Sequence, residues 1–175
     1  MAGPRVGILS DTHDNKWALQ AILGRFREEG VEMVVHAGDY VAPFNAKHFS
    51  VLTCPFVGVF GNNDGERVGL TKAFAKVGSI HVGPHPVSIG NRRLLVMHEP
   101  AALDALARSG EYDALIYGHT HALDLRAVPR AQGDGTTLII NPGEGCGWLH
   151  DRATAVLLDL DSMTYDLIEV PTHPR

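Results

Sequence analysis

The sequence predicts an α/β protein in which two packed β-sheets are flanked by helices. In the first half, short apolar runs alternate with amphipathic segments in the order strand–helix–strand–helix–strand. This order favours a parallel sheet with right-handed crossovers. In the second half, Gly and Pro separate shorter strand-like runs, which is typical of hairpins. Both halves fit two mixed sheets, and we expect one domain spanning residues 1–175.

Three strands and two helices are predicted in the first half. The strands are short apolar runs at 6–9, 33–36 and 55–60. A helix is predicted at 15–29, because its apolar residues follow an amphipathic period and Gly30 can end it. A second helix is predicted at 66–76. The segment 42–49 would be a further helix if Asp39 acts only as its cap.

The second half is predicted to contain one helix among hairpins. The helix covers 101–109 and is ended by Gly110. Gly90-Asn91 and the polar segment 130–135 are expected hairpin tips, and 141–147 is a glycine-rich turn. Strands are predicted at 79–82, 86–89, 92–97, 113–117, 122–128, 136–140, 153–160 and 163–170.

The composition excludes several classes of protein. Hydrophobic residues make up 45% and charged residues 20% of the chain, as in soluble globular proteins. The net charge of −5 argues against a general nucleic-acid binder. Two separated cysteines imply no disulfide framework, so we expect a cytoplasmic location. No apolar run suits a signal peptide or a membrane span, and no membrane partner is expected.

Polar side chains recur where the predicted strands end. In an extended backbone Asp11 and His13 would point to the same face, and the same holds for His119 and His121. Functional groups of parallel sheets gather beyond the carboxyl ends of the strands. Taken singly, each residue could instead belong to a turn, cap a helix or be a structural histidine. The full set is Asp11, His13, Asp39, Asn62, His98, His119 and His121.

These seven side chains offer oxygen and imidazole donors without a thiolate, which suits a pair of divalent transition metals. If Asp39 bridges the pair, each metal has about four protein ligands and keeps an open position. Two metals roughly 3.5–4 Å apart suit in-line displacement at phosphorus, with a bridging water as the attacking group.

Five blocks of sequence, in this order, resemble the signature of the calcineurin-like metallophosphoesterases. The blocks are Asp11-x-His13, Gly38-Asp39, Gly61-Asn62-Asn63-Asp64, His98 and Gly118-His119-x-His121. The resemblance spans about residues 5–147, and the small size and Asn141-Pro142-Gly143 are similar to the family's compact prokaryotic phosphodiesterase branch.

The resemblance implies a four-layer αββα sandwich and a ligand set for each metal. One metal would bind Asp11, His13, Asp39 and His121. The other would bind Asp39, Asn62, His98 and His119. The metals are expected to be manganese, with nickel, iron or zinc as alternatives. The catalytic residues implied are Asn63, Asp39 and His98.

Three positions depart from the family pattern. Many relatives carry His where this chain has Asn63, so the source of the leaving-group proton is open. Glu99 stands where Gly is common, and Glu144 stands where a small polar residue is common. We expect the two glutamates to narrow the mouth of the site or to repel anionic substrates.

The predicted function is a dinuclear-metal phosphodiesterase acting on a small or nucleotide-like diester. The alternatives are a phosphomonoesterase and a non-catalytic binding scaffold of the same fold, such as the retromer subunit, which has lost part of the ligand set. Every ligand position is filled here, which favours an enzyme. The expected partner is a small-molecule diester, without stable nucleic-acid binding; whether the chain forms a homo-oligomer is open.

Overall fold

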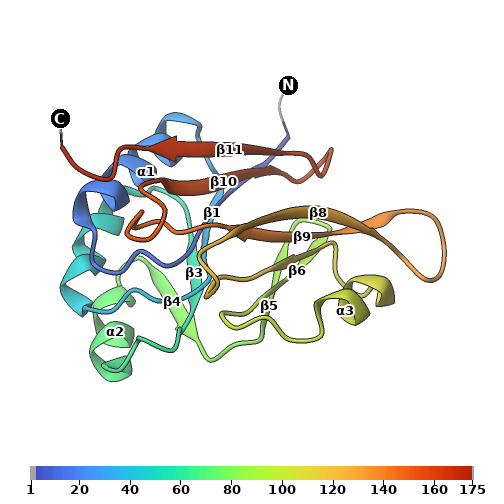
Figure 1. The fold of residues 1–175 in the computed structure, drawn as a ribbon, viewed down its shortest axis with the longest axis horizontal. Coiled ribbons are helices and arrows are strands. Elements are labelled where there is room, and N and C mark those ends of the chain that lie inside the picture. Colours follow the sequence, from blue (N-terminus) through green and yellow to red (C-terminus); the bar gives the residue numbers. More distant parts are fainter. Residues whose placement is uncertain (1–2, 175) are drawn as a thin grey trace.

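The computed structural model describes residues 3–174 and arranges them in four layers (Figure 1). Helices cover one face of a six-stranded sheet, and the other face of that sheet packs against a five-stranded sheet. Helix α3 (Leu103–Ser109) covers the outer face of the second sheet. The predicted αββα sandwich is therefore confirmed.

The first sheet has a parallel centre and an antiparallel edge. Strands β1 (Arg5–Leu9), β2 (Met33–His36), β3 (Phe56–Val59) and β4 (Gly78–His81) run parallel. On the other side of β1 lie β10 (Ala153–Asp159) and β11 (Tyr165–Val170), each antiparallel to its neighbour. The order is β11-β10-β1-β2-β3-β4.

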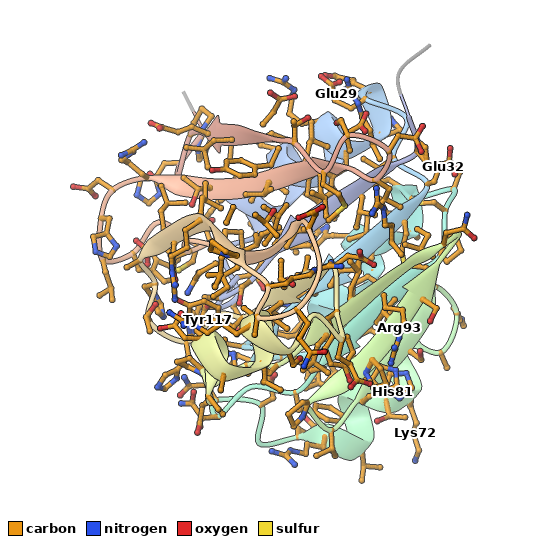
Figure 2. The ribbon with its side chains drawn as sticks, turned by 90° about the vertical axis from the view of Figure 1, so that its right-hand side faces the viewer. Glu29, Glu32, Lys72, His81, Arg93 and Tyr117 are labelled. Carbon is orange, nitrogen blue, oxygen red and sulfur yellow. The ribbon has the colours of Figure 1, made fainter. Side chains whose placement is uncertain are left out.

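The second sheet is also mixed and has the order β5-β6-β7-β9-β8. Strands β6 (Arg92–Val96), β7 (Ala114–Ile116) and β9 (Thr136–Pro142) are parallel. Hairpins add β5 (His85–Ile89) and β8 (Leu123–Pro129) as antiparallel edges. Figure 2 turns this side of the molecule toward the viewer, with Tyr117 beside α3.

The helical layer on the first sheet consists of α1 (Lys16–Glu28), η1 (Pro43–Val51) and α2 (Arg67–Phe74). Helix α1 begins where the Asn15 side chain accepts a hydrogen bond from the Ala18 backbone at 3.3 Å. The segment at 42–49 is a 3-10 helix that starts with Pro43, and Asp39 does not cap it. Asp39 is therefore free for another role.

Three apolar clusters fill the spaces between the four layers. Between the helices and the first sheet, Phe56 lies 5.0 Å from both Phe49 and Phe74 between ring centroids. Between the sheets, Ile8 and Ile116 are fully buried, and such side chains contribute about 1.5–3 kcal/mol each. This packing fixes the two sheets against each other, and with them the loops at their edges.

The element boundaries differ from the predicted ones by one or two residues in most cases. The predicted helix at 101–109 begins at Leu103, and the predicted strand at 113–117 is reduced to Ala114–Ile116. Within residues 3–174, every helix is too short or too polar to cross a membrane.

Candidate functional site

The loops after five parallel strands meet at one edge of the sandwich, where they bring all seven predicted ligands together. Asp11 and His13 follow β1, Asp39 follows β2, Asn62 follows β3, His98 follows β6, and His119 and His121 follow β7. Backbone hydrogen bonds join the loops: Asp11 N donates to Gly38 O at 2.9 Å, and Gly118 N donates to His98 O at 3.1 Å.

The backbone of these loops is left-handed rather than extended. The φ angle is +51° at Asp11, +34° at His13, +64° at Asp39, +68° at His119 and +59° at His121. Non-glycine residues rarely adopt this region, and such strain concentrates at functional sites. The expectation that Asp11 and His13 converge because of strand alternation was wrong. The strand ends at Leu9, and the turn beyond it aims the side chains.

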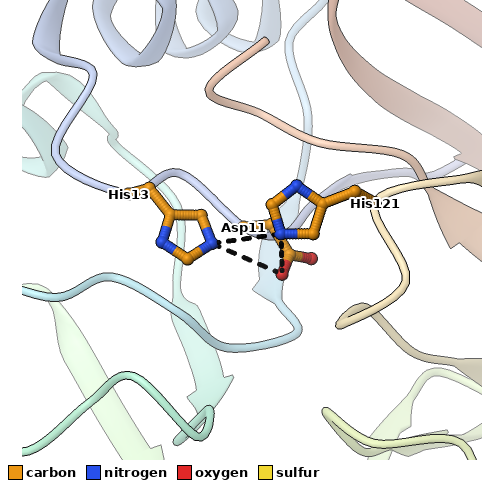
Figure 3. A group of neighbouring side chains, drawn as sticks. All are labelled: Asp11, His13 and His121. Carbon is orange, nitrogen blue, oxygen red and sulfur yellow. Dashed lines mark hydrogen bonds and ion pairs between the residues drawn. The ribbon is translucent and has the colours of Figure 1, made fainter. Parts of the chain in front are cut away.

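The first donor group surrounds His13 Nε2. This atom lies 3.2 Å from His121 Nε2 and 3.8 Å from Asp11 Oδ1 (Figure 3). His121 Nε2 is in turn 3.4 Å from Asp11 Oδ1. Asp39 Oδ2 completes the group at 3.4 Å from His13 Nε2.

The second donor group shares Asp39 Oδ2 with the first. This oxygen lies 3.4 Å from His98 Nε2. Asn62 Oδ1 lies 2.8 Å from His98 Nε2 and 2.8 Å from His119 Nδ1. The second group thus contains one carboxylate oxygen, one amide oxygen and two imidazole nitrogens.

The spacing of these atoms fits metal binding. Ligand atoms bound at about 2.0–2.2 Å around one ion must lie roughly 3–3.5 Å from one another. Four of the seven separations given above lie in this range, at 3.2–3.4 Å, and the other three are 2.8, 2.8 and 3.8 Å. Asp11, His13 and His121 form a cluster that could hold an ion. Asp11, Asp39 and His98 form another. The donor set contains nitrogen and oxygen only, which suits manganese, iron, nickel or zinc.

The electrostatics of the site favour cations. Although burial opposes ionisation, hydrogen bonds from His98 and Asn63 hold the pKa of Asp39 well below its usual range. Burial also disfavours charged histidines, but Asp11 and Asp39 raise the pKa of His13, and Asp39 raises the pKa of His98. The same carboxylates would attract metal ions in place of those protons.

Asp64 is a supporting residue to which the sequence interpretation assigned no role. Its carboxylate is buried and accepts four backbone N–H bonds: from Asp39 at 3.0 Å, Tyr40 at 2.8 Å, Val41 at 2.8 Å and Gly61 at 2.7 Å. It therefore joins the loop after β2 to the loop after β3. The sequence feature that could have indicated this role is the position of Asp64 in a tight turn, directly after Asn62 and Asn63.

Glu144 lies behind the site and not at its mouth. Only 1% of it is exposed, and its Oε2 lies 2.7 Å from His121 Nδ1. Although burial opposes ionisation, hydrogen bonds from His121 and the His150 backbone lower the pKa of Glu144. The expectation that Glu144 narrows the mouth or repels substrates was wrong. Backbone bonds from Gly145 to Ser10 at 2.8 Å and from Cys146 to Asp11 at 3.0 Å draw this turn inward.

Cys146, in the same turn, is a buried thiol. Burial and the nearby Glu144 carboxylate raise its pKa to about 12, so in the metal-free protein the thiol is protonated and is a poor nucleophile.

Asn63 and Glu99 lie on the open side of the site. The Asn63 side chain donates to Asp39 Oδ2 at 2.8 Å, and its backbone N–H donates to Asp39 Oδ1 at 2.8 Å. Glu99 is exposed and lines a groove of about 350 Å³ that begins at Asn62 and His98. Arg67 lies on the same groove, with its guanidinium 5.1 Å from the Phe60 ring centroid.

Comparison with known proteins gives consistent matches. Residues 5–163 match the family model of the calcineurin-like phosphoesterase superfamily domain. The chain is 34% identical to phosphodiesterase MJ0936 of Methanocaldococcus jannaschii, over 92% of this chain and 96% of that protein.

Two solved structures are informative in different ways. The structure of a novel archaeal phosphodiesterase has a TM-score of 0.86 and 34% identity, covering 95% of this chain and 99% of that one. Vacuolar protein sorting 29 from Cryptosporidium parvum has a TM-score of 0.60 and 17% identity, covering 97% and 98% of the two chains. At 17% identity, the likeness to vacuolar protein sorting 29 shows a shared fold and says nothing about a shared function.

Proposed function

Because the chain belongs to the calcineurin-like phosphoesterase superfamily, we propose that it is a dinuclear-metal-dependent phosphodiesterase that hydrolyses a small or nucleotide-like diester. One observation carries the proposal. Asp39 Oδ2 lies 3.4 Å from His13 Nε2 and 3.4 Å from His98 Nε2. A single carboxylate oxygen between two nitrogen and oxygen donor groups is what a bridging ligand requires.

In this proposal the first metal is held by Asp11, His13, Asp39 and His121, and the second by Asp39, Asn62, His98 and His119. Manganese is the proposed metal, with nickel, iron and zinc as alternatives that the same donors accept. Two such ions supply Lewis acidity toward phosphoryl oxygens and lower the pKa of bound water. The free thiols of Cys54 and Cys146 support placing the reaction in the cytoplasm.

The chain's own side chains bind and orient the ester. The Asn63 amide can turn from Asp39 to donate hydrogen bonds to phosphoryl oxygens, which stabilises developing negative charge. Arg67 places a permanent cation on the groove beside Asn62 and His98, and so favours an anionic ester there. The same groove can hold one organic arm of a diester.

Hydrolysis of bis(p-nitrophenyl) phosphate by metal-stripped protein tests the proposal. We expect chelation to abolish turnover and manganese to restore it. The exposed-loop variant Asp134→Asn serves as a matched control that should behave as wild type. Full turnover by metal-stripped protein would contradict the proposal.

Two further measurements separate the alternatives. Comparing kcat/KM for bis(p-nitrophenyl) phosphate and p-nitrophenyl phosphate distinguishes a diesterase from a monoesterase. If the protein binds two manganese ions and hydrolyses neither ester, the binding scaffold becomes the better assignment.

A further inference from the structure

Glu144, which is none of the seven proposed ligands, makes a set of buried contacts behind the first donor group. Its carboxylate is buried, and Oε2 lies 2.7 Å from His121 Nδ1, the ring nitrogen on the far side from the donor atom Nε2. Cys146 Sγ donates to the same oxygen at 3.5 Å. A carboxylate can only accept, so Nδ1 donates to it, and the neutral imidazole with its proton on Nδ1 presents Nε2 as a metal donor toward Asp11 and His13.

Glu144 also orders the loop that supports the other histidine of this group. The backbone N–H groups of Leu149 and His150 donate to its Oε1 at 2.9 and 2.7 Å. In the same loop, Trp148 Nε1 donates to the backbone oxygen of His13 at 3.1 Å. The Glu144 carboxylate therefore contacts His121 directly. It also holds the loop at 147–150, whose Trp148 side chain binds the His13 backbone.

The second donor group has a different support. There, His98 Nδ1 faces a neutral acceptor, the Ala37 carbonyl oxygen, at 2.8 Å. A carboxylate behind a ligating imidazole makes the imidazole a stronger donor than a carbonyl does, and losing such a partner typically costs 10–100-fold in metal affinity. The first donor group therefore has a carboxylate behind one of its imidazoles, whereas His98 in the second group has only a neutral carbonyl oxygen.

We propose that Glu144 is a positioning residue for the first metal, and that it makes this site the tighter of the two, so that it fills first. The inference rests on the proposed function, because it presupposes that His13 and His121 bind a metal. In this proposal Glu144 contacts neither the substrate nor the second metal, and it acts only through His121 and His13.

Manganese titration of the metal-stripped full chain, by calorimetry with electron paramagnetic resonance to count free ions, tests the inference. We expect two unequal dissociation constants in the wild type. In Glu144→Gln, which keeps size and one acceptor but removes the charge, the tighter constant should weaken by about 10–100-fold, and the weaker one should change by less than about threefold.

Two variants guard against a merely structural effect. Glu144→Ser introduces the small polar residue that is common at this position in the family, and it should weaken the tighter site at least as much as Glu144→Gln. Asp113→Asn removes a carboxylate that accepts from the Arg93 backbone at 2.8 Å in a different part of the fold, and it should leave both constants unchanged. Thermal unfolding in chelator measures the loss of stability separately for each variant.

Several outcomes would overturn the inference. These are unchanged constants in Glu144→Gln, equal weakening of both sites, or weakening of the same size in Asp113→Asn. If wild-type protein binds one manganese with a Glu144-dependent affinity, the role of Glu144 stands and the dinuclear part of the proposed function fails. If wild-type protein binds none, both fail.

Discussion

At the scale of single residues, the site depends on Asp39. Its Oδ2 faces His13 and His98, while Asn63 donates to both of its oxygens. The neighbouring imidazoles and amides keep this carboxylate ionised, and that charge is what can hold two cations close together.

Asp39→Asn removes the charge between the proposed metals without changing the size of the side chain. Repulsion between the two cations would then be poorly offset, and at least one should be lost. We expect metal content to fall from about two ions per chain toward one or none, with loss of turnover. Elemental analysis after gel filtration measures this, with Asp166→Asn on β11 as control. Two ions in Asp39→Asn would show that the bridge is assigned wrongly.

Asn63 limits the chemistry in a different way, because an amide can donate hydrogen bonds but cannot release a proton near neutral pH. Lack of a general acid typically costs about 10²–10⁴ in rate, and most with poor leaving groups. We expect Asn63→His to improve alkyl diesters selectively and to add a basic limb to the pH–rate profile, since the acid must be protonated. The measurement is kcat/KM against leaving-group pKa for both proteins. Equal slopes would exclude this role for position 63.

At the scale of elements, the site is a set of strand-end loops held together by Asp64. The loop after β2 and the loop after β3 each donate backbone N–H groups to this one carboxylate. Neither loop has regular secondary structure. The buried Asp64 carboxylate therefore accepts the backbone N–H bonds that a neighbouring strand would accept within a sheet.

Asp64→Asn replaces two acceptors by one and points an NH₂ group at backbone donors. We expect a loss of about 2–4 kcal/mol in the free energy of unfolding, because buried N–H groups are left without partners. Urea unfolding in chelator measures this loss, and metal content should fall as well, because Asp39 and Asn62 are no longer held. Asp134→Asn, in the exposed loop, is the control. Wild-type stability in Asp64→Asn would contradict the role assigned to this residue.

At the scale of the whole molecule, the same edge of the fold that carries the site also contains a buried neutral histidine. Burial of the ring, with further cationic charge from His98, holds the pKa of His36 well below its usual value. Gly38 N donates to Nδ1 at 3.1 Å, so that nitrogen is unprotonated, and Nε2 lies 3.1 Å from Thr12 Oγ1. Protonating the ring would break the first of these bonds.

The consequence is a pH-dependent stability. The unfolded chain takes up a proton on His36 as the pH falls through about 6.5, whereas the folded chain resists it. The contribution of His36 is therefore complete above pH 7 and is lost as the pH falls, with a slope that approaches about 1.4 kcal/mol per pH unit. His36→Gln should lack this contribution.

Urea unfolding from pH 7.5 to 5.5 in chelator, compared between wild type and His36→Gln, isolates the effect. The raised pKa values of His13 and His98 act in the opposite direction, but they are common to both proteins. We expect the stability of the wild type to fall more steeply toward pH 5.5. Parallel curves would mean that His36 is not the group responsible.

The sequence by itself predicted the class of fold and singled out seven donor side chains that lie together at one edge of it. Apolar runs and amphipathic periods are local signals, so strands, helices and their alternation could be predicted to within a few residues. The position of polar side chains after several strands was enough to single out seven donors, because parallel strands end at a shared edge.

Only the tertiary structure decided how those donors are aimed and supported. The left-handed turns at Asp11 and Asp39, the four bonds to Asp64 and the buried place of Glu144 depend on sheet pairing. Asn62 and His119 meet across 57 residues, and His13 and His121 across 108. Sequence periodicity reports on neighbours within a few positions, whereas these contacts exist because strands distant in the chain pair and pack side by side.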